Sequence, residues 1–282
     1  MYDILYICRF MEVFMSANAY QNDALVRGAN LCHLNIRNIY CGSHTGHWNS
    51  SLPVNRLIYI FSAGSSPNGI SSAETYCALL PGVWLFIPAF LQVRHEQEDL
   101  ELLSIHFNVE LYQHLELFTG EHLKFGKAPA WRTQMRKFGE ISDNFEKSFA
   151  LRGFIWNFLA QKILPDCTVL EQRIKQFQRF APLIEKIGRC PWRDLTVAQM
   201  AATMHMGKET FAKLFPAATG ESPKDFFNQM RAGFAARELE NPAYTVAEIA
   251  EKYGFSSPFY FSRFFKRYLG VSPKLYQKNS RA

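Results

Sequence analysis

The sequence predicts a two-domain α+β protein, in which a β-rich N-terminal domain with trailing helices precedes an all-α C-terminal domain. Three observations lead to this prediction. Residues 31–110 are short apolar runs separated by turn residues, apolar residues between 134 and 163 follow helical spacing, and the C-terminal third contains an internal repeat. The chain has 282 residues, of which 48% are apolar, so two hydrophobic cores are expected. We place the domains at residues 1–172 and 173–282.

The N-terminal region is composed of runs that suit strands of an antiparallel sandwich or barrel. RLIYIFSAG (56–64) leads into the turn sequence SSPNG (65–69), and TYCALLPG, VWLFIP and DLELLSIHF follow. Short runs rich in Ile, Val, Phe and Tyr and interrupted by Pro and Gly are typical of all-β architectures.

Residues 134–163 predict one long amphipathic helix or two shorter ones, followed by a linker at 164–172. The helical spacing is carried by Phe138, Ile141, Phe145, Phe149, Arg152, Trp156 and Leu159. The stripe formed by Phe145, Phe149, Trp156 and Leu159 has two interpretations, which are packing onto the β domain and a shared homodimer interface.

The C-terminal repeat indicates two copies of one supersecondary unit. LFPAATGESPK (214–224) matches FFKRYLGVSPK (264–274) at an offset of 50 residues, and TVAQMA (196–201) matches TVAEIA (245–250) at an offset of 49. Each copy begins with a capping box, Thr196-x-x-Gln199 or Thr245-x-x-Glu248. In the second copy we expect the first helix to end at Gly254 and Ser256 to cap the next. Two helix-turn-helix units are therefore predicted, at about 196–218 and 245–269.

The second helix of the second copy separates aromatic residues from cations. At 100° per residue, its inward face carries Phe261, Phe264, Phe265 and Tyr268. Its outward face carries Arg263, Lys266 and Arg267, together with Phe259 and Tyr260. An inward aromatic face indicates core, because a stacking platform for single strands needs exposed rings.

The cations have two interpretations, a solvated helix face or contact with double-stranded DNA. Residues 173–282 carry 18 Lys and Arg against 9 Asp and Glu, whereas residues 1–172 carry 13 against 16. A basic domain, a helix-turn-helix outline and a cationic face without acids together favour DNA contact.

The first copy has a poorer outward face and is predicted to contribute less phosphate affinity. Its inward stripe is Phe211, Leu214, Phe215 and Ala218, and its outward residues are Glu209, Thr210, Lys213 and Pro216. Since proline removes a helical hydrogen bond, we expect this helix to kink or fray after Phe215.

The segment IAEKYGFSSPFYFSRFFKRYLGVSPKLYQ (249–277) resembles the signature of AraC/XylS-type transcriptional regulators. The resemblance implies two helix-turn-helix units joined by one helix at about 223–239, with each second helix in the major groove. It assigns DNA contact to Gly207, Lys208, Glu209, Thr210, Lys213, Ser256, Ser257, Phe259, Tyr260, Arg263, Lys266 and Arg267. The first copy departs from the pattern, with Gly207 for a serine cap, His205 for the turn glycine and Pro216 for a common lysine.

The N-terminal region resembles the sensor domain of the same family more loosely. LLPGVWLFIPAF (79–90) and IHF (105–107) carry that resemblance, which implies a cupin-like β-barrel followed by dimerising helices. Val93 stands near the position of a histidine that is common in the family, so an effector would be held by other groups. We name His47, Trp48, Arg56, Tyr59 and His106 as candidate effector-binding residues. For Arg56 the alternative is an arginine at a strand edge in water.

A metal-dependent cupin enzyme is a rival interpretation, based on His44, His47, His95 and His106. Cupin metal sites use two histidines two residues apart on one strand, whereas His44 and His47 are three apart and lie in a turn-like sequence. We therefore expect no metal, cofactor or catalytic group. A third possibility is a regulator without a ligand, whose barrel only dimerises.

The remaining expectations concern partners and location. Six cysteines with no paired spacing indicate free thiols, and Asp3, Arg9 and Glu12 interrupt the apolar N-terminus, which suits neither a signal peptide nor a membrane span. The sequence thus predicts a cytoplasmic, non-enzymatic transcriptional regulator that binds double-stranded DNA. Its expected partners are a second copy of the chain, a small effector and RNA polymerase.

Overall fold

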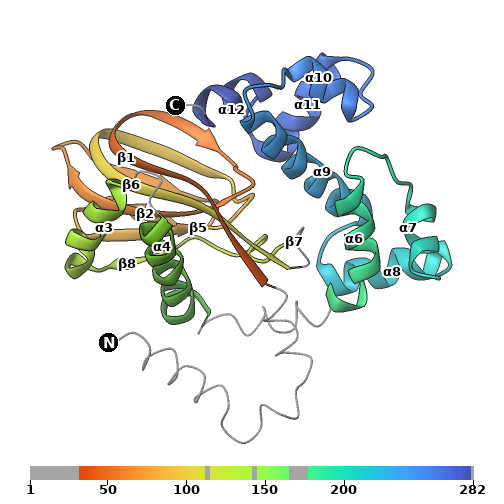
Figure 1. Ribbon diagram of the computed structural model, residues 1–282, viewed down its shortest axis with the longest axis horizontal. Coiled ribbons are helices and arrows are strands. Elements are labelled where there is room, and N and C mark those ends of the chain that lie inside the picture. Colours follow the sequence, from red (N-terminus) through yellow and green to blue (C-terminus); the bar gives the residue numbers. More distant parts are fainter. Residues whose placement is uncertain (1–31, 112–114, 142–144, 165–176, 281–282) are drawn as a thin grey trace, which may run out of the picture.

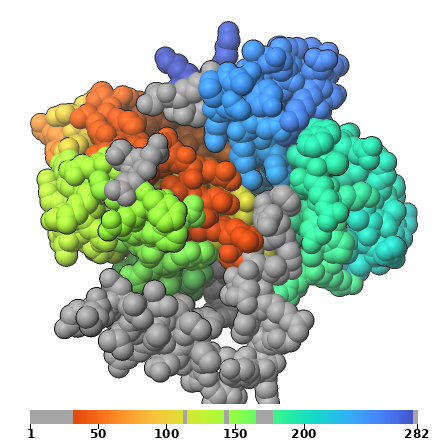
Figure 2. Space-filling view, viewed as in Figure 1, coloured from red at the N-terminus to blue at the C-terminus, as the bar shows by residue number. Residues whose placement is uncertain are grey.

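The protein consists of a nearly closed antiparallel β-barrel followed by a helical domain that packs beside it (Figure 1). The computed structural model describes residues 32–111, 115–141, 145–164 and 177–280. The space-filling view shows the two parts in contact along one side (Figure 2). The predicted architecture, a barrel followed by an all-α domain, is confirmed.

Two long strands form the spine of the barrel. The strands are β1 (Cys32–Ser50), β2 (Asn55–Ala63), β3 (Gly69–Ser71), β4 (Tyr76–Ala78), β5 (Val83–Ile87), β6 (Val93–Leu111), β7 (Leu115–Glu116) and β8 (Lys124–Lys127). They pair in the order β4-β3-β6-β2-β5-β8, while β1 and β7 also pair with β6. All pairings are antiparallel. Because β6 contacts four strands, its alternating side chains reach every part of the sheet.

The two faces of the sheet have separate cores. Leu57, Tyr59 and Phe61 of β2 point to the face covered by the helices that follow the barrel. Ile58 and Ile60 point to the barrel interior, beside Leu102 of β6. Arg56 is two residues before Ile58 on β2, so its side chain points to the same interior face and lies among apolar side chains.

Two helices follow the barrel, α3 (Arg132–Gly139) and α4 (Phe145–Phe158), and a π-helical turn (Leu159–Ile163) extends α4. Of the predicted apolar stripe, only Leu159 is buried. Phe145, Phe149 and Trp156 are 79%, 61% and 40% exposed, so the interpretation as packing onto the barrel applies to Leu159 and not to these three rings. The barrel is contacted by a neighbouring set, Leu151, Phe154, Ile155 and Phe158. The predicted linker at 164–172 lies outside the described residues after Leu164.

The C-terminal domain is built around the central helix α9 (Pro223–Glu240), which joins two helix-turn-helix units (Figure 1). Its other helices are α6 (Ala181–Arg189), α7 (Val197–Thr203), α8 (Lys208–Thr219), α10 (Val246–Lys252), α11 (Pro258–Leu269) and α12 (Pro273–Ser280). Both capping boxes form, and Gly254 follows α10 in the left-handed region, with φ 69°.

Two local predictions in this domain were wrong. The cap of α11 is Ser257 rather than Ser256, because the Ser257 hydroxyl accepts the N–H of Tyr260. Helix α8 does not fray after Phe215 but continues to Thr219, where Gly220 closes it. One missing N–H at Pro216 is outweighed by the buried rings of Phe211 and Phe215 that hold the helix in place.

Candidate nucleic-acid interface and effector site

Helix α11 presents a cationic face to solvent because its aromatic face is buried. Phe261, Phe265 and Leu269 are fully buried in the core formed with α9, α10 and α12. Phe264 and Tyr268 lie half-buried at the edge of that core. The side chains of Arg263, Lys266 and Arg267 are exposed. The packing of α11 therefore fixes the direction in which the three charges point.

The N-terminal end of α11 adds exposed aromatic rings to this surface. Phe259 and Tyr260 are 66% and 57% exposed, and their rings meet edge to face with centroids 5.9 Å apart. The guanidinium of Arg263 lies over the Phe259 ring at 5.9 Å. Ser256 is exposed beside them, and Ser257 caps the helix. These groups form one surface with the three cations of α11.

Helix α8 occupies the equivalent place in the first unit with fewer cations. Lys208, Glu209, Thr210 and Lys213 are exposed, and Gly207 is the N-cap without a side-chain hydrogen bond. The preceding turn holds His205 at φ 53°, where the second unit has Gly254. The first unit thus adopts the same left-handed backbone conformation at a residue with a side chain, which makes this conformation strained.

A buried polar cluster lies inside the barrel, around Arg56. The Arg56 side chain is 4% exposed, so an arginine at a strand edge in water was wrong. Its Nη1 donates to the Ser50 hydroxyl at 3.1 Å, and this hydroxyl lies 2.9 Å from Nε2 of His95. The His95 ring stacks on Trp48 with centroids 4.5 Å apart.

The structure brings together some of the candidate effector residues and separates others. Arg56 and His106 face each other across β2 and β6, and Trp48 joins them through His95. Tyr59 points to the opposite face, where its hydroxyl donates to the carbonyl of Ala128, and His47 is exposed. Both are therefore outside this cluster.

Sequence reasoning missed part of this cluster, namely Ser50, His95 as a polar partner, Gln97 and Ser104. The available signal was parity, since His95 and Gln97, and likewise Ser104 and His106, are two residues apart on either side of an irregularity at Asp99 in β6. The segment at His44–His47 is a continuation of β1 with a register shift, so its interpretation as a turn was wrong. Within the described ranges, no three His, Cys, Asp or Glu side chains gather as a metal site.

Burial keeps the histidines of the cluster neutral. It lowers the pKa of His95 to about 2, with smaller effects from the Arg56 charge and His44. The same causes lower the pKa of His106 to about 3. Burial alone lowers the pKa of Arg56 to about 10, so the guanidinium stays charged at neutral pH.

The C-terminal region matches known proteins. Residues 200–279 fit a protein-family profile described as a helix-turn-helix domain. A putative AraC-like transcription regulator from Streptomyces lividans is 37% identical over 93 residues, which are 33% of this chain and 31% of that protein. The MtrA regulator from Neisseria gonorrhoeae is 32% identical over 103 residues, 36% of this chain and 34% of its own. The chain carries an AraC/XylS-type helix-turn-helix domain. The matched region spans only about a third of the relatives' own length.

The two-domain fold also has solved counterparts. The structure of Vibrio cholerae ToxT with a bound unsaturated fatty acid has a TM-score of 0.57 and 12% identity, covering 86% of this chain and 94% of ToxT. A second ToxT structure, at 1.65 Å resolution, has a TM-score of 0.53 and 12% identity, covering 87% and 97%. At this identity the likeness concerns the fold, which pairs an AraC-type domain with a barrel.

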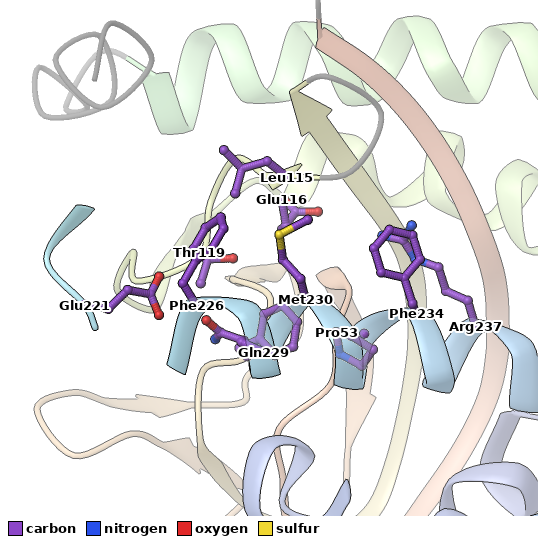
Figure 3. Close-up of a pocket in the computed structure, with 12 residues that line it drawn as sticks. Pro53, Leu115, Glu116, Thr119, Glu221, Phe226, Gln229, Met230, Phe234 and Arg237 are labelled. Atoms are coloured by element: carbon purple, nitrogen blue, oxygen red, sulfur yellow. The ribbon is translucent and has the colours of Figure 1, made fainter. Parts of the chain in front are cut away.

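The AraC-type domain is attached to the barrel by a partly buried ion pair. Arg237 of α9 donates through Nη2 to Oε1 of Glu110 on β6, whose side chain is 3% exposed. Arg37 of β1 reaches the same oxygen at 3.3 Å. Glu116 lies close by, as Figure 3 shows for the side chains at the domain boundary.

A small cavity of about 30 Å³ lies beside this ion pair, between α9 and the loops of the barrel (Figure 3). It is lined by Phe226, Met230 and Arg237 from α9 and by Leu115 and Glu116 from the barrel. A volume of this size holds one or two water molecules and no organic effector. In this conformation the two domains are therefore closely packed.

No helix among the described segments is sufficiently long and apolar to span a bilayer.

Proposed function

We propose that this protein is a sequence-specific transcriptional regulator that binds double-stranded DNA through α8 and α11. One observation carries the proposal: Arg263, Lys266 and Arg267 are exposed together on the second helix of a helix-turn-helix whose other face is buried. In such units the second helix enters the major groove and neighbouring cations contact phosphates. The N-terminal end of α11, with Ser256, Phe259 and Tyr260, is then the part that meets base edges.

The barrel is the regulatory part in this proposal. Its polar interior gives a small effector a place to bind, and α9 connects the barrel to both helix-turn-helix units. The fold likeness to ToxT, of which one structure holds an unsaturated fatty acid, supports an effector-responsive barrel. Binding inside the barrel would act on DNA affinity through the Arg237–Glu110 contact, if the two barrel states pack differently on α9.

DNA binding is tested by selecting sequences from a random duplex pool and measuring affinity by fluorescence anisotropy over a range of salt. Because each phosphate neutralised contributes about 0.9 to the slope of log K against log salt, Lys266→Gln reduces that slope by about 0.9. Lys147→Gln, an exposed lysine on α4 in the barrel domain, is the matched control and leaves the slope unchanged.

Equal affinity for all duplexes, or no dependence on salt, would show that the AraC-type domain does not act as a sequence reader. An equal loss in Lys266→Gln and Lys147→Gln would show that only the total charge matters and that α11 is not the contact surface.

We further propose that the chain dimerises through α4. Phe145, Phe149 and Trp156 are spaced by four and seven residues on one helix face, and the Phe145 and Phe149 rings contact each other with centroids 4.7 Å apart. An exposed aromatic stripe of this kind suits a partner helix. Light scattering after size exclusion measures the mass directly. We expect a dimer that Phe149→Ser converts to a monomer, whereas Phe125→Ser, at another exposed ring on β8, leaves it dimeric. A wild-type monomer at micromolar concentration with and without DNA removes this proposal.

A further inference from the structure

Arg56 is a buried cation that uses at most two of its five N–H donors. Its Nη1 donates to Ser50 at 3.1 Å and lies 3.4 Å from Nε2 of His95. Its Nε and Nη2 are shielded from solvent and have no hydrogen-bond partner within the described part of the chain. A buried donor without a partner costs about 1–3 kcal/mol, and more when it is charged.

The other unsatisfied group in the cluster has an internal solution. The Oε1 atom of Gln97 has no partner as placed, while its Nε2 lies 3.3 Å from Nδ1 of His95. When the Gln97 amide is rotated by about 180°, its oxygen and nitrogen exchange places, and His95 Nδ1–H then donates to Oε1. His95 Nε2 then accepts from the Ser50 hydroxyl, which itself accepts from Arg56 Nη1. The relay from Gln97 to Arg56 is thus complete without involving Nε or Nη2 of Arg56.

The two nitrogens without partners, Nε and Nη2, form one edge of the guanidinium plane. Nε–H and the outer N–H of Nη2 are parallel, and this edge forms two hydrogen bonds at once with a carboxylate or phosphate. The edge that is left unpaired is therefore one that recognises planar oxyanions, whereas unrelated packing defects would leave scattered atoms.

The surroundings supply no counter-charge of their own. Within the described residues no Asp or Glu forms an ion pair with Arg56, and burial alone is the cause of its lowered pKa. His95 and His106, the nearest titratable side chains, are neutral. An unpaired charge in such a site is costly unless a ligand neutralises it.

We propose that the Nε/Nη2 edge of Arg56 binds the carboxylate of a small monocarboxylic acid inside the barrel. One cation matches one negative charge, which favours a carboxylate over a phosphate dianion. Ile87 lies directly opposite Arg56 on β5 and Ile58 follows on the same face, so the body of the acid is apolar. Since Nε and Nη2 are closed off from solvent, the acid enters when the barrel opens and is sealed from water once bound. This inference rests on the proposed function, because it names the effector class of that barrel.

The test uses the full-length protein and linear monocarboxylates from acetate to octanoate, with inorganic phosphate as a second probe. Affinity is measured by calorimetry, and stability by the midpoint of thermal unfolding. We expect 1:1 binding that tightens with chain length. Arg56→Met weakens octanoate binding by at least about 30-fold, because it removes one partner of a buried charge pair. Arg56→Lys, which keeps the charge but loses the bidentate edge, gives an intermediate loss.

A second measurement keeps the proposal refutable if the variants bind nothing. Without ligand, Arg56→Met melts at or above the wild-type temperature, because the substitution removes an uncompensated buried charge. A large fall in its melting temperature, together with no effect of any carboxylate on the wild type, overturns the proposal and makes Arg56 a structural partner of Ser50. Equal binding of phosphate and octanoate overturns the commitment to a carboxylate. DNA binding is measured separately for the wild type and Arg56→Met, and its absence in the wild type would count against the proposed function and not against this site.

Discussion

The buried contact between Arg237 and Glu110 should hold the AraC-type domain against the barrel, and Arg237→Met tests this directly. Methionine keeps the length of the aliphatic stem and removes the charge. The two residues are 127 positions apart in the chain, so their pairing reports domain packing rather than local structure. The substitution leaves Glu110, which is 3% exposed, with Arg37 at 3.3 Å and Asn35 at 3.5 Å as remaining partners.

The expected loss in the free energy of unfolding depends on which partners Glu110 retains after the substitution. Removing one partner of a buried ion pair costs about 3–5 kcal/mol when the other charge is left unpaired. Because Arg37 still compensates Glu110, and its side chain is 26% exposed, we expect the lower end, about 3 kcal/mol in the free energy of unfolding. Glu110→Gln is costly for the same reason, since it leaves Arg237 buried beside a neutral amide.

A double-mutant cycle separates this pair from general damage. Urea unfolding of Arg237→Met, Glu110→Gln and the double variant gives a coupling energy, which we expect to be about 2 kcal/mol. Small-angle scattering of Arg237→Met then shows whether the domains move apart, as an increase in the radius of gyration. Additive losses, with a coupling energy below about 0.5 kcal/mol, would refute the ion pair as the interdomain contact.

Three further predictions concern the DNA surface, the barrel and the first turn. Lys213→Ala weakens DNA binding less than Lys266→Ala in anisotropy titrations, since α8 has fewer exposed cations than α11; the reverse order would contradict this ranking. His95 has a pKa of about 2 when folded and about 6.5 when unfolded, so the unfolded state takes up the proton first and stability is lost as pH falls below 6.5. The difference in unfolding free energy between wild type and His95→Gln should therefore change with pH below 6.5, by a slope that approaches about 1.4 kcal/mol per pH unit near pH 5, and a constant difference excludes a buried neutral histidine. His205→Gly raises stability by about 1 kcal/mol because it removes a side chain from a left-handed backbone position, whereas Gly254→Ala lowers it by a similar amount; a loss in His205→Gly or a gain in Gly254→Ala on chemical denaturation would contradict the turn geometry.

The helical domain could be predicted from the sequence because its signals are local. The capping boxes, the glycine after α10 and the 3.6-residue spacing of Phe261, Phe265 and Leu269 each need only a few neighbouring residues. The two errors there, Ser256 as the cap and fraying of α8 after Phe215, concern single hydrogen bonds. Tertiary packing decides such details at helix ends, and sequence patterns do not record it.

The barrel interior could be predicted only in part because it depends on pairing between distant strands. Arg56 and His106 are 50 residues apart, and their juxtaposition follows from the register between β2 and β6. An irregularity at Asp99, where β6 shifts its register against β1, changes which residues of β6 face inward, so alternation counted from Val93 does not carry through to His106. The sequence left two interpretations of the α4 rings open for a related reason, since helical spacing identifies an apolar stripe but not which part of it meets the barrel.

A comparison of Arg237 with Arg56 shows why the partner of an arginine matters more than its burial. Arg237 is half-buried and Arg56 is buried, and burial lowers the pKa of both. Arg237 has a carboxylate from the other domain within contact distance, so its charge is used to join the domains. Arg56 has a hydroxyl and a neutral imidazole on one side and nothing on the bidentate edge. Because a chain gains no stability from an uncompensated buried charge, the fold explains the first arginine, whereas the unpaired edge of the second is the basis for the carboxylate ligand that we propose.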